Sequence, residues 1–193
     1  MIEWAEYYAA QAGRAARPTL QRALELRGGD PGSAIDLGCG EGSDTRFLLQ
    51  GGWRVYAVDG APGVEERVRA GVPAELLSRL VVEQRDFVDI RELPAADLSY
   101  SGFALPFCPP ESFPTLWAAV RSSLVPSGYF AGELFGPRDS WSGRADMNFH
   151  DREQVDELLA GLDILDIVEE ENDGMSFSGP KHWHVFHVVA RIP

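Results

Sequence analysis

Two short apolar runs joined by a glycine-rich turn dominate the first part of the chain. The first run, residues 34–37, leads into the turn Gly38–Gly42, with the sequence GCGEG, and residues 43–50 have the composition of a helix. The second run, residues 55–58, ends on the carboxylate of Asp59. A strand, a glycine turn, a helix and a second strand that ends on an acid about twenty residues later predict a nucleotide-binding βαβ unit. The glycines let the backbone approach a ligand, and the acid can accept hydrogen bonds from two ribose hydroxyls.

The spacing inside the turn argues against a dinucleotide. The dinucleotide fingerprint is G-x-G-x-x-G, whereas here Gly42 comes one position early and the acidic Glu41 lies within the turn. Pyrophosphate binds best to the open amides of a helix N-terminus, without a neighbouring negative charge. Asp36, two residues before Gly38, adds a second carboxylate to the same rim. A cationic cofactor without phosphate, such as S-adenosylmethionine, suits this acidic rim better.

These residues resemble motif I of the class I S-adenosylmethionine-dependent methyltransferases, and Asp59 falls where that family holds the ribose. The resemblance covers nearly the whole chain. It implies an α/β fold with a doubly wound, seven-stranded, mostly parallel sheet and an antiparallel final strand. It also implies S-adenosylmethionine as cofactor and S-adenosylhomocysteine as product, and it places an acid and an apolar side chain, Asp86 and Phe87, at the adenine. The cofactor-binding residues expected in this way are Asp36, Gly38, Cys39, Gly40, Gly42, Asp59, Gly60, Ala61, Asp86, Phe87 and Ser101.

The remaining segments complete a single domain over residues 1–193. Further strands are expected at residues 81–84, 96–101, 129–135, 164–171 and 183–192. The last two would form an antiparallel hairpin through a loop at residues 171–181. Further helices are expected at residues 2–16, 19–27, 64–70, 113–124 and 151–160. In related methyltransferases an N-terminal helix covers the bound ligands, so residues 1–30 are expected to form a helical lid, although ordinary packing explains the same pattern equally well.

Composition restricts the class of partner. The chain has 17 basic and 30 acidic residues, a net charge of −13, whereas binding to a phosphate backbone needs clustered Lys and Arg. No run is long and apolar enough to cross a bilayer, and the N-terminus lacks the features of a signal peptide. We therefore expect a cytoplasmic enzyme with a small-molecule acceptor that binds neither nucleic acid nor membrane. The oligomeric state stays open between monomer and homodimer.

The acceptor is expected at the carboxyl ends of the later strands, where open α/β sheets bind their ligands. The apolar loop 102–110 lacks the Asn/Asp-Pro-Pro-Tyr/Phe sequence of enzymes that methylate the exocyclic nitrogens of bases, so that reaction is not expected. The size and tail of the chain are similar to small stand-alone methyltransferases of small molecules, including tellurite- and thiopurine-type members. The side chains expected to contact the acceptor are Trp4, Tyr8, Phe103, Phe107 and Trp141.

Methyl transfer needs little acid–base help when the acceptor is already nucleophilic, because positioning alone can supply up to about 7–11 kcal/mol. Residues 181–187 nevertheless read KHWHVFH. On a strand, His182 and His184 share one face and His187 lies on the other. His182 or His184 could accept or orient the proton of the acceptor, since histidine titrates near working pH, whereas His187 fits an ordinary sheet histidine. A metal is not expected, because no third ligand accompanies the pair.

Two other functions are compatible with the same sequence. A regulatory protein could keep the S-adenosylmethionine-binding fold without turnover. A nicotinamide-dependent dehydrogenase would need the third fingerprint glycine and a Tyr-x-x-x-Lys pair, and the chain has neither.

Overall fold

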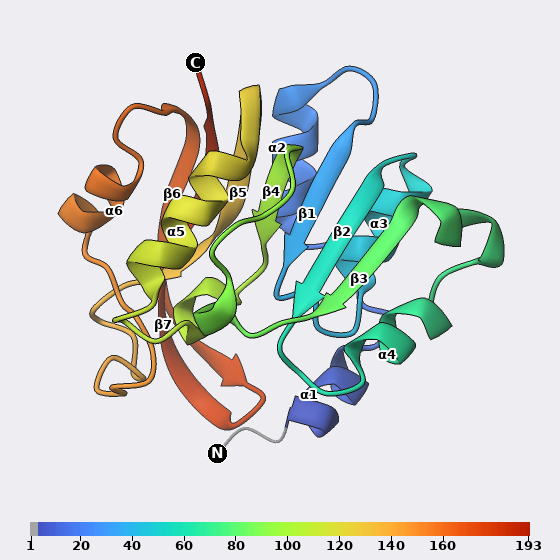
Figure 1. The fold of residues 1–193 in the computed structure, drawn as a ribbon. Helices are drawn as coiled ribbons and strands as arrows, with labels where there is room; N and C mark the ends of the chain where they lie inside the picture. Colours follow the sequence, from blue (N-terminus) through green and yellow to red (C-terminus); the bar gives the residue numbers. More distant parts are fainter. Residues whose placement is uncertain (1–3) are drawn as a thin grey trace.

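The computed structural model describes residues 4–193, without the side chains of Trp4, Ala5 and Ala9. A seven-stranded sheet runs through the molecule in the order β3-β2-β1-β4-β5-β7-β6 (Figure 1). The strands are β1 Ser33–Leu37, β2 Arg54–Asp59, β3 Leu80–Gln84, β4 Ala96–Ser101, β5 Leu124–Phe135, β6 Asp163–Ser176 and β7 Gly179–Arg191. Strands β1 to β5 are parallel, and β7 runs antiparallel to both β5 and β6. The predicted fold class is confirmed.

Helices cover both faces of the sheet, so the fold is doubly wound (Figure 1). Their bounds are α1 Trp4–Gln11, α2 Pro18–Arg27, α3 Ser43–Gln50, α4 Val64–Ala70, α5 Phe113–Ser123 and α6 Arg152–Leu158. Helix α1 ends earlier than the predicted helix 2–16, and its predicted first residues lie outside the described part of the chain. None of the helices within residues 4–193 combines the length and apolarity that a membrane span requires.

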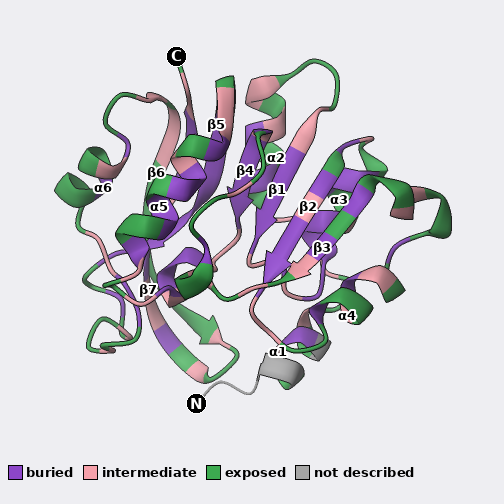
Figure 2. Ribbon diagram, in the orientation of Figure 1, coloured by how far each residue is buried: buried purple, intermediate pink, exposed green. Residues whose placement is uncertain are grey.

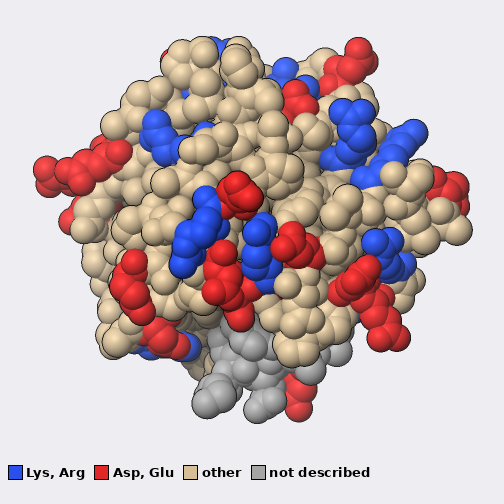
Figure 3. Space-filling view, viewed as in Figure 1, with Lys and Arg blue, Asp and Glu red and all other residues tan. Residues whose placement is uncertain are grey.

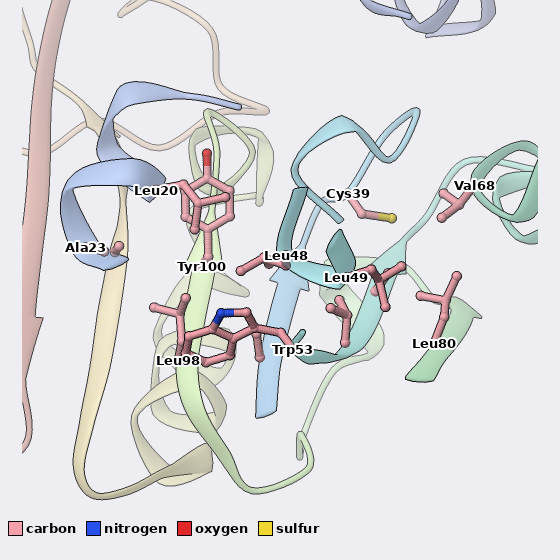
Figure 4. Packing of buried hydrophobic residues seen from close by; sticks show 14 of the residues in the cluster. Leu20, Ala23, Cys39, Leu48, Leu49, Trp53, Val68, Leu80, Leu98 and Tyr100 are labelled. Carbon is pink, nitrogen blue, oxygen red and sulfur yellow. The ribbon is translucent and has the colours of Figure 1, made fainter. Parts of the chain in front are cut away.

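Two apolar clusters, one on each face, hold the helices to the sheet. Alternation along β1 sends Ala34 into the cluster with α2, α3 and α4, and Ile35 and Leu37 into the cluster with α5 and α6. Figure 4 shows the first cluster, where Leu20 of α2 and Leu48 of α3 lie close to Tyr100 of β4. The central strands are buried on both faces (Figure 2), as parallel strands under two helical layers must be.

The segment expected to be a loop, residues 171–181, is instead a continuation of the hairpin. Pairing of β6 with β7 extends to Ser176 opposite Gly179, so that only Phe177 and Ser178 form the turn. Gly179 has a φ of 117°, which a side chain rarely adopts, and this glycine allows the tight reversal. The hairpin projects beyond the sheet toward α1 (Figure 1). Its Phe177 ring contacts Tyr7 of α1, with the ring centroids 5.7 Å apart.

Candidate active site

A cleft of about 840 Å³ lies at the carboxyl ends of the parallel strands, between the glycine turn and the β6–β7 hairpin. Its walls are formed by that turn, the end of β2, the segments that follow β3 and β4, helix α1 and the hairpin. The sheet order places β1 between β2 and β4. Chain connections leave in opposite directions at this point, which is where open α/β sheets bind ligands.

The glycine turn forms the floor of the cleft because its backbone passes close to neighbouring segments. The amides of Gly38 and Cys39 donate to the carbonyl of Val58, at 2.8 and 3.1 Å, and fix the turn on the end of β2. A Cβ at Gly38 would overlap Ala104, and a Cβ at Gly40 would lie 3.2 Å from the Tyr8 ring. Side chains at these two positions would therefore collide with, or press against, the neighbouring segments.

Asp59 is buried at the tip of β2 and holds three segments together. Its Oδ2 accepts from the amide of Gly40 at 2.9 Å, and its Oδ1 accepts from the amide of Ala61 at 2.9 Å. The hydroxyl of Tyr8 also donates to Oδ1, at 3.3 Å. Burial and the charge of Asp59 raise the pKa of Tyr8, so this tyrosine stays a neutral donor. A carboxylate has about four acceptor positions, so these three donors leave one, on Oδ2, for a ribose hydroxyl.

Eight of the eleven residues expected at the cofactor line the cleft: Gly38, Cys39, Gly40, Asp59, Gly60, Ala61, Asp86 and Phe87. Asp86 lies against the backbone of Gly60, where a Cβ would overlap its carboxylate, and the Phe87 ring lies 3.2 Å from the position of a Cβ on Gly38. Asp59, expected at the ribose, and the two residues expected at the adenine thus lie along one wall of the cleft.

The other three expected cofactor residues lie behind that wall. Asp36 is buried and accepts from Oγ1 of Thr45 at 2.5 Å; burial and the charge of Asp44 raise the pKa of Asp36 to about 7. Gly42, with a φ of 87°, precedes α3, and a Cβ there would lie 3.1 Å from Val68. Ser101 donates to the carbonyl of Leu37 at 2.9 Å. In this structure these residues support the turn and the strand ends without reaching the cleft.

Four of the five aromatic residues expected at the acceptor line the same cleft: Tyr8, Phe103, Phe107 and Trp141. The fifth, Trp4, belongs to α1, and its side chain lies outside the described part of the structure. Phe135 and Trp183 add two more rings to this wall, and each lies near Phe103, with ring centroids 6.1 Å apart. The acceptor side of the cleft is therefore largely apolar.

The aromatic wall contains a cation of its own. The ammonium of Lys181 lies 3.8 Å from the ring centroid of Trp183 and 4.2 Å from that of Trp141, and it pairs with Asp139. Both charged side chains are fully buried, and desolvation lowers the pKa of Lys181. This arrangement was not predicted, because Lys181 fell in the predicted loop.

The three histidines of β7 divide between its two faces as alternation requires. The face toward the cleft is that of His187, and not the face of His182 and His184, which were expected there. His182 pairs with Asp173 at 2.8 Å on the exposed hairpin, and His184 is buried beside Glu169 at 2.9 Å. Neither lines the cleft, whereas His187 does. The register of β7, with His187 opposite Glu133 of β5, decides this outcome. We therefore do not propose His182 or His184 as catalytic residues.

Charges on the surface are mixed. On the face shown in Figure 3, basic and acidic side chains are interspersed and no large basic area is seen. Within residues 4–193, no three His, Cys, Asp or Glu side chains are grouped so as to hold a metal ion.

Comparison with known proteins identifies the domain. Residues 34–128 match a family described as a methyltransferase domain. The chain is 27% identical to a carboxy-S-adenosyl-L-methionine synthase from Erwinia tasmaniensis, over 76% of this chain and 67% of that protein. It is 26% identical to a trans-aconitate 2-methyltransferase from Methylobacterium nodulans, over 69% of this chain and 50% of that protein. The chain thus matches only half the length of this second relative.

Solved structures share the fold. TehB from Haemophilus influenzae superposes with a TM-score of 0.77 at 15% identity, over 98% of this chain and 67% of that one. A 1,6-didemethyltoxoflavin N1-methyltransferase from Burkholderia thailandensis was solved with 1,6-didemethyltoxoflavin and S-adenosylhomocysteine bound. It superposes with a TM-score of 0.71 at 20% identity, over 98% of this chain and 83% of that one. About half of the chain thus matches a methyltransferase-domain family, and the solved structures share the fold of the whole chain. The strand order, with the glycine turn and Asp59 at the switch point, agrees with the resemblance to the class I S-adenosylmethionine-dependent methyltransferases.

Proposed function

We propose that this protein binds S-adenosylmethionine along the wall formed by the glycine turn, Asp59, Asp86 and Phe87, and transfers its methyl group to a small-molecule acceptor. The observation that carries the proposal is the contact between Asp59 and the turn. One carboxylate oxygen binds the amide of Gly40 at 2.9 Å, so the ribose acceptor and the floor of the cleft are held in one fixed arrangement. The structure with bound S-adenosylhomocysteine supports the choice of cofactor, because it has the same fold.

S-Adenosylmethionine, when bound, supplies an electrophilic methyl group on a sulfonium. This protein's residues then have to orient the two reactants in line and exclude water. The carboxylate of Asp59 would accept hydrogen bonds from the ribose, Asp86 would accept from the adenine amine, and Phe87 would cover the adenine ring. The apolar rings of Phe103, Phe107 and Trp141 would hold the acceptor and keep water away from it.

The acceptor is proposed to be a small, partly apolar molecule. The cleft has a volume of about 840 Å³ and shares one space between cofactor and acceptor, which suits a metabolite better than a macromolecule. Two similar proteins are named for small acceptors, trans-aconitate and 1,6-didemethyltoxoflavin. A cationic acceptor has less support, since the ammonium of Lys181 already lies over the rings of Trp141 and Trp183.

The alternative is a protein that binds the cofactor without turnover. Two measurements separate it from the enzyme. Calorimetry with S-adenosylhomocysteine tests binding, and incubation of methyl-labelled S-adenosylmethionine with a metabolite extract tests transfer. The enzyme is expected to bind the product saturably and to label at least one small molecule. Binding without label in any extract would favour the regulatory protein, and an absence of binding to folded protein would overturn both.

A further inference from the structure

His187 lies between two carboxylates at the edge of the acceptor side of the cleft. Its Nδ1 is 3.4 Å from Oε1 of the buried Glu133 and 3.2 Å from Oγ1 of Thr19. Its Nε2 is 3.1 Å from Oε2 of Glu170, which is half exposed on β6. The two ring nitrogens therefore face different surroundings. Nδ1 faces the buried carboxylate of Glu133, and Nε2 faces the half-exposed carboxylate of Glu170.

This asymmetry sets the tautomer of the neutral ring. Glu133 is 1% exposed, and its Oε1 makes no hydrogen bond among the described residues, with Nδ1 of His187 as a neighbour at 3.4 Å. A buried carboxylate without a donor is costly, so the proton of the neutral imidazole belongs on Nδ1, facing Glu133. The lone pair of Nε2 then points away from the buried side, toward the cleft, and because two acceptors repel each other the half-exposed Glu170 has to turn away from it in this tautomer. That arrangement is the one a proton acceptor needs.

Glu133 also fixes the loop that borders the acceptor. Its Oε2 accepts from the amide of Phe103 at 3.1 Å, while its Oε1 faces His187. The Phe103 ring in turn lies 6.0 Å from the His187 ring, centroid to centroid. One buried carboxylate thus holds both the aromatic wall and the imidazole in place. Both Phe103 and His187 line the cleft.

We propose that His187 accepts, at Nε2, the proton that the acceptor loses when it is methylated, and that Glu133 is the positioning residue for His187. This inference rests on the proposed function and narrows the acceptor to a hydroxyl or amine that carries a proton. The lone pair of its oxygen or nitrogen forms the bond to the methyl carbon, and the electrons of the broken carbon–sulfur bond stay on sulfur. The proton passes to Nε2, and the imidazolium is balanced by Glu133 and Glu170.

The charges around His187 favour this transfer. The facing groups are Glu133 of β5, Glu170 of β6 and the uncharged Thr19 of α2, and the partner of His187 on β6 is the apolar Val168. A cation on the same cleft wall is Arg17, whose guanidinium lies over the Phe103 ring at 4.6 Å. Burial alone would lower the pKa of His187, but the two carboxylates raise it above its usual value. The neutral ring is therefore a stronger base than a free imidazole.

The test uses phenol, whose hydroxyl can give up a proton, and its methyl ether anisole, which has none. Both probes suit an apolar cleft. Protein labelled at histidine is saturated with S-adenosylhomocysteine and titrated with each probe by NMR, with the His187 signal assigned from His187→Gln. We expect phenol to shift the His187 ring signal saturably and anisole to leave it nearly unchanged. His187→Gln is expected to weaken phenol binding at least fivefold and to change anisole and S-adenosylhomocysteine binding less than twofold. His182→Gln, on the other face of β7, is the matched control.

A second variant tests the positioning role. Glu133→Gln is expected to lower the pKa of His187 measured in the same spectra, a readout that loss of packing alone would not move. The conservative variant Glu133→Asp keeps the charge and is expected to retain most of the raised pKa. Saturable phenol binding that leaves His187 unmoved, equal effects of the His187 and His182 variants, or no saturable binding of phenol to the complex would each overturn the assignment. Failure of wild-type protein to bind S-adenosylhomocysteine would instead contradict the proposed function.

Discussion

The hydroxyl of Tyr8 lies 3.3 Å from Oδ1 of Asp59, so helix α1 donates a hydrogen bond to the carboxylate at the end of β2. A Cβ on Gly40 would lie 3.2 Å from the Tyr8 ring, and the guanidinium of Arg67 lies over that ring at 4.3 Å. A ribose hydroxyl bound to the same oxygen would have to share it with Tyr8. In the proposed complex, helix α1 and the cofactor would therefore compete for one carboxylate oxygen.

Removing the Tyr8 hydroxyl is expected to strengthen cofactor binding. Tyr8→Phe leaves the ring in place and frees an acceptor position on Asp59, which corresponds to about 0.5–1 kcal/mol for one neutral hydrogen bond. Calorimetry should show a two- to fivefold gain in affinity for S-adenosylhomocysteine, while Tyr56→Phe, outside the cleft, should show none. Weaker binding of S-adenosylhomocysteine by Tyr8→Phe would mean that the hydroxyl assists the cofactor.

The buried Asp36 is expected to make stability fall as pH rises. Its pKa is about 7 in the folded protein, against 3.8 for an ordinary aspartate. Between these values the folded protein holds a proton that the unfolded chain has released, so the free energy of unfolding decreases with increasing pH. Asp36→Asn has no proton to lose. From about pH 5.5 to about pH 8, its free energy of unfolding relative to wild type should rise by at least about 1 kcal/mol. A difference that stays constant over this range in urea titrations would contradict the raised pKa.

The Lys181–Asp139 pair is expected to stabilise the aromatic wall only as a pair. Both side chains are fully buried, so Lys181→Met would leave an uncompensated carboxylate and cost about 3–5 kcal/mol. The double variant Lys181→Met/Asp139→Asn should recover a large part of that loss, since the amide oxygen can still accept from the amide of Trp141. Denaturant unfolding measures both. A double variant no more stable than the single one would refute this account of the pair.

The tip of the hairpin is expected to hold α1 in place over the cleft. Phe177 is an exposed residue whose ring packs against Tyr7. Phe177→Ser should therefore change the free energy of unfolding by less than about 0.5 kcal/mol while it speeds amide hydrogen exchange in residues 4–11. Val168→Ser, at an exposed position of β6 away from the tip, serves as the control. Equal rates of amide exchange in α1 for both variants would show that the hairpin tip does not hold α1 in place.

The sheet could be predicted from sequence because its parallel strands are short apolar runs between clear turn signals. The glycine turn and Asp59 also follow from local sequence, since a strand end places the next side chain at the sheet edge. The extension of β6 and β7 could not be read in the same way. Residues 171–181 are polar and contain glycine, and only their pairing with each other makes them a hairpin.

Strand register, which the sequence does not reveal, decides which histidines of β7 face the cleft. Alternation separates His187 from His182 and His184, but which face meets the cleft depends on the pairing of β7 with β5, where His187 lies opposite Glu133. Asp36, Gly42 and Ser101 lie close to the cleft in sequence and behind its wall in space. A short motif predicts a neighbourhood, and the direction of each side chain comes from tertiary structure.

The central claim is that Asp59, held by the glycine turn, binds the ribose of S-adenosylmethionine. Calorimetry with S-adenosylhomocysteine on Asp59→Asn, with wild type and the surface variant Asp146→Asn as controls, tests it most directly. Hydrogen bonds to a charged group contribute about 1.5–3 kcal/mol each, so Asp59→Asn should lose at least tenfold in affinity while Asp146→Asn keeps the wild-type value. Equal affinities of the Asp59 variant and wild type, with both proteins folded, would contradict the account.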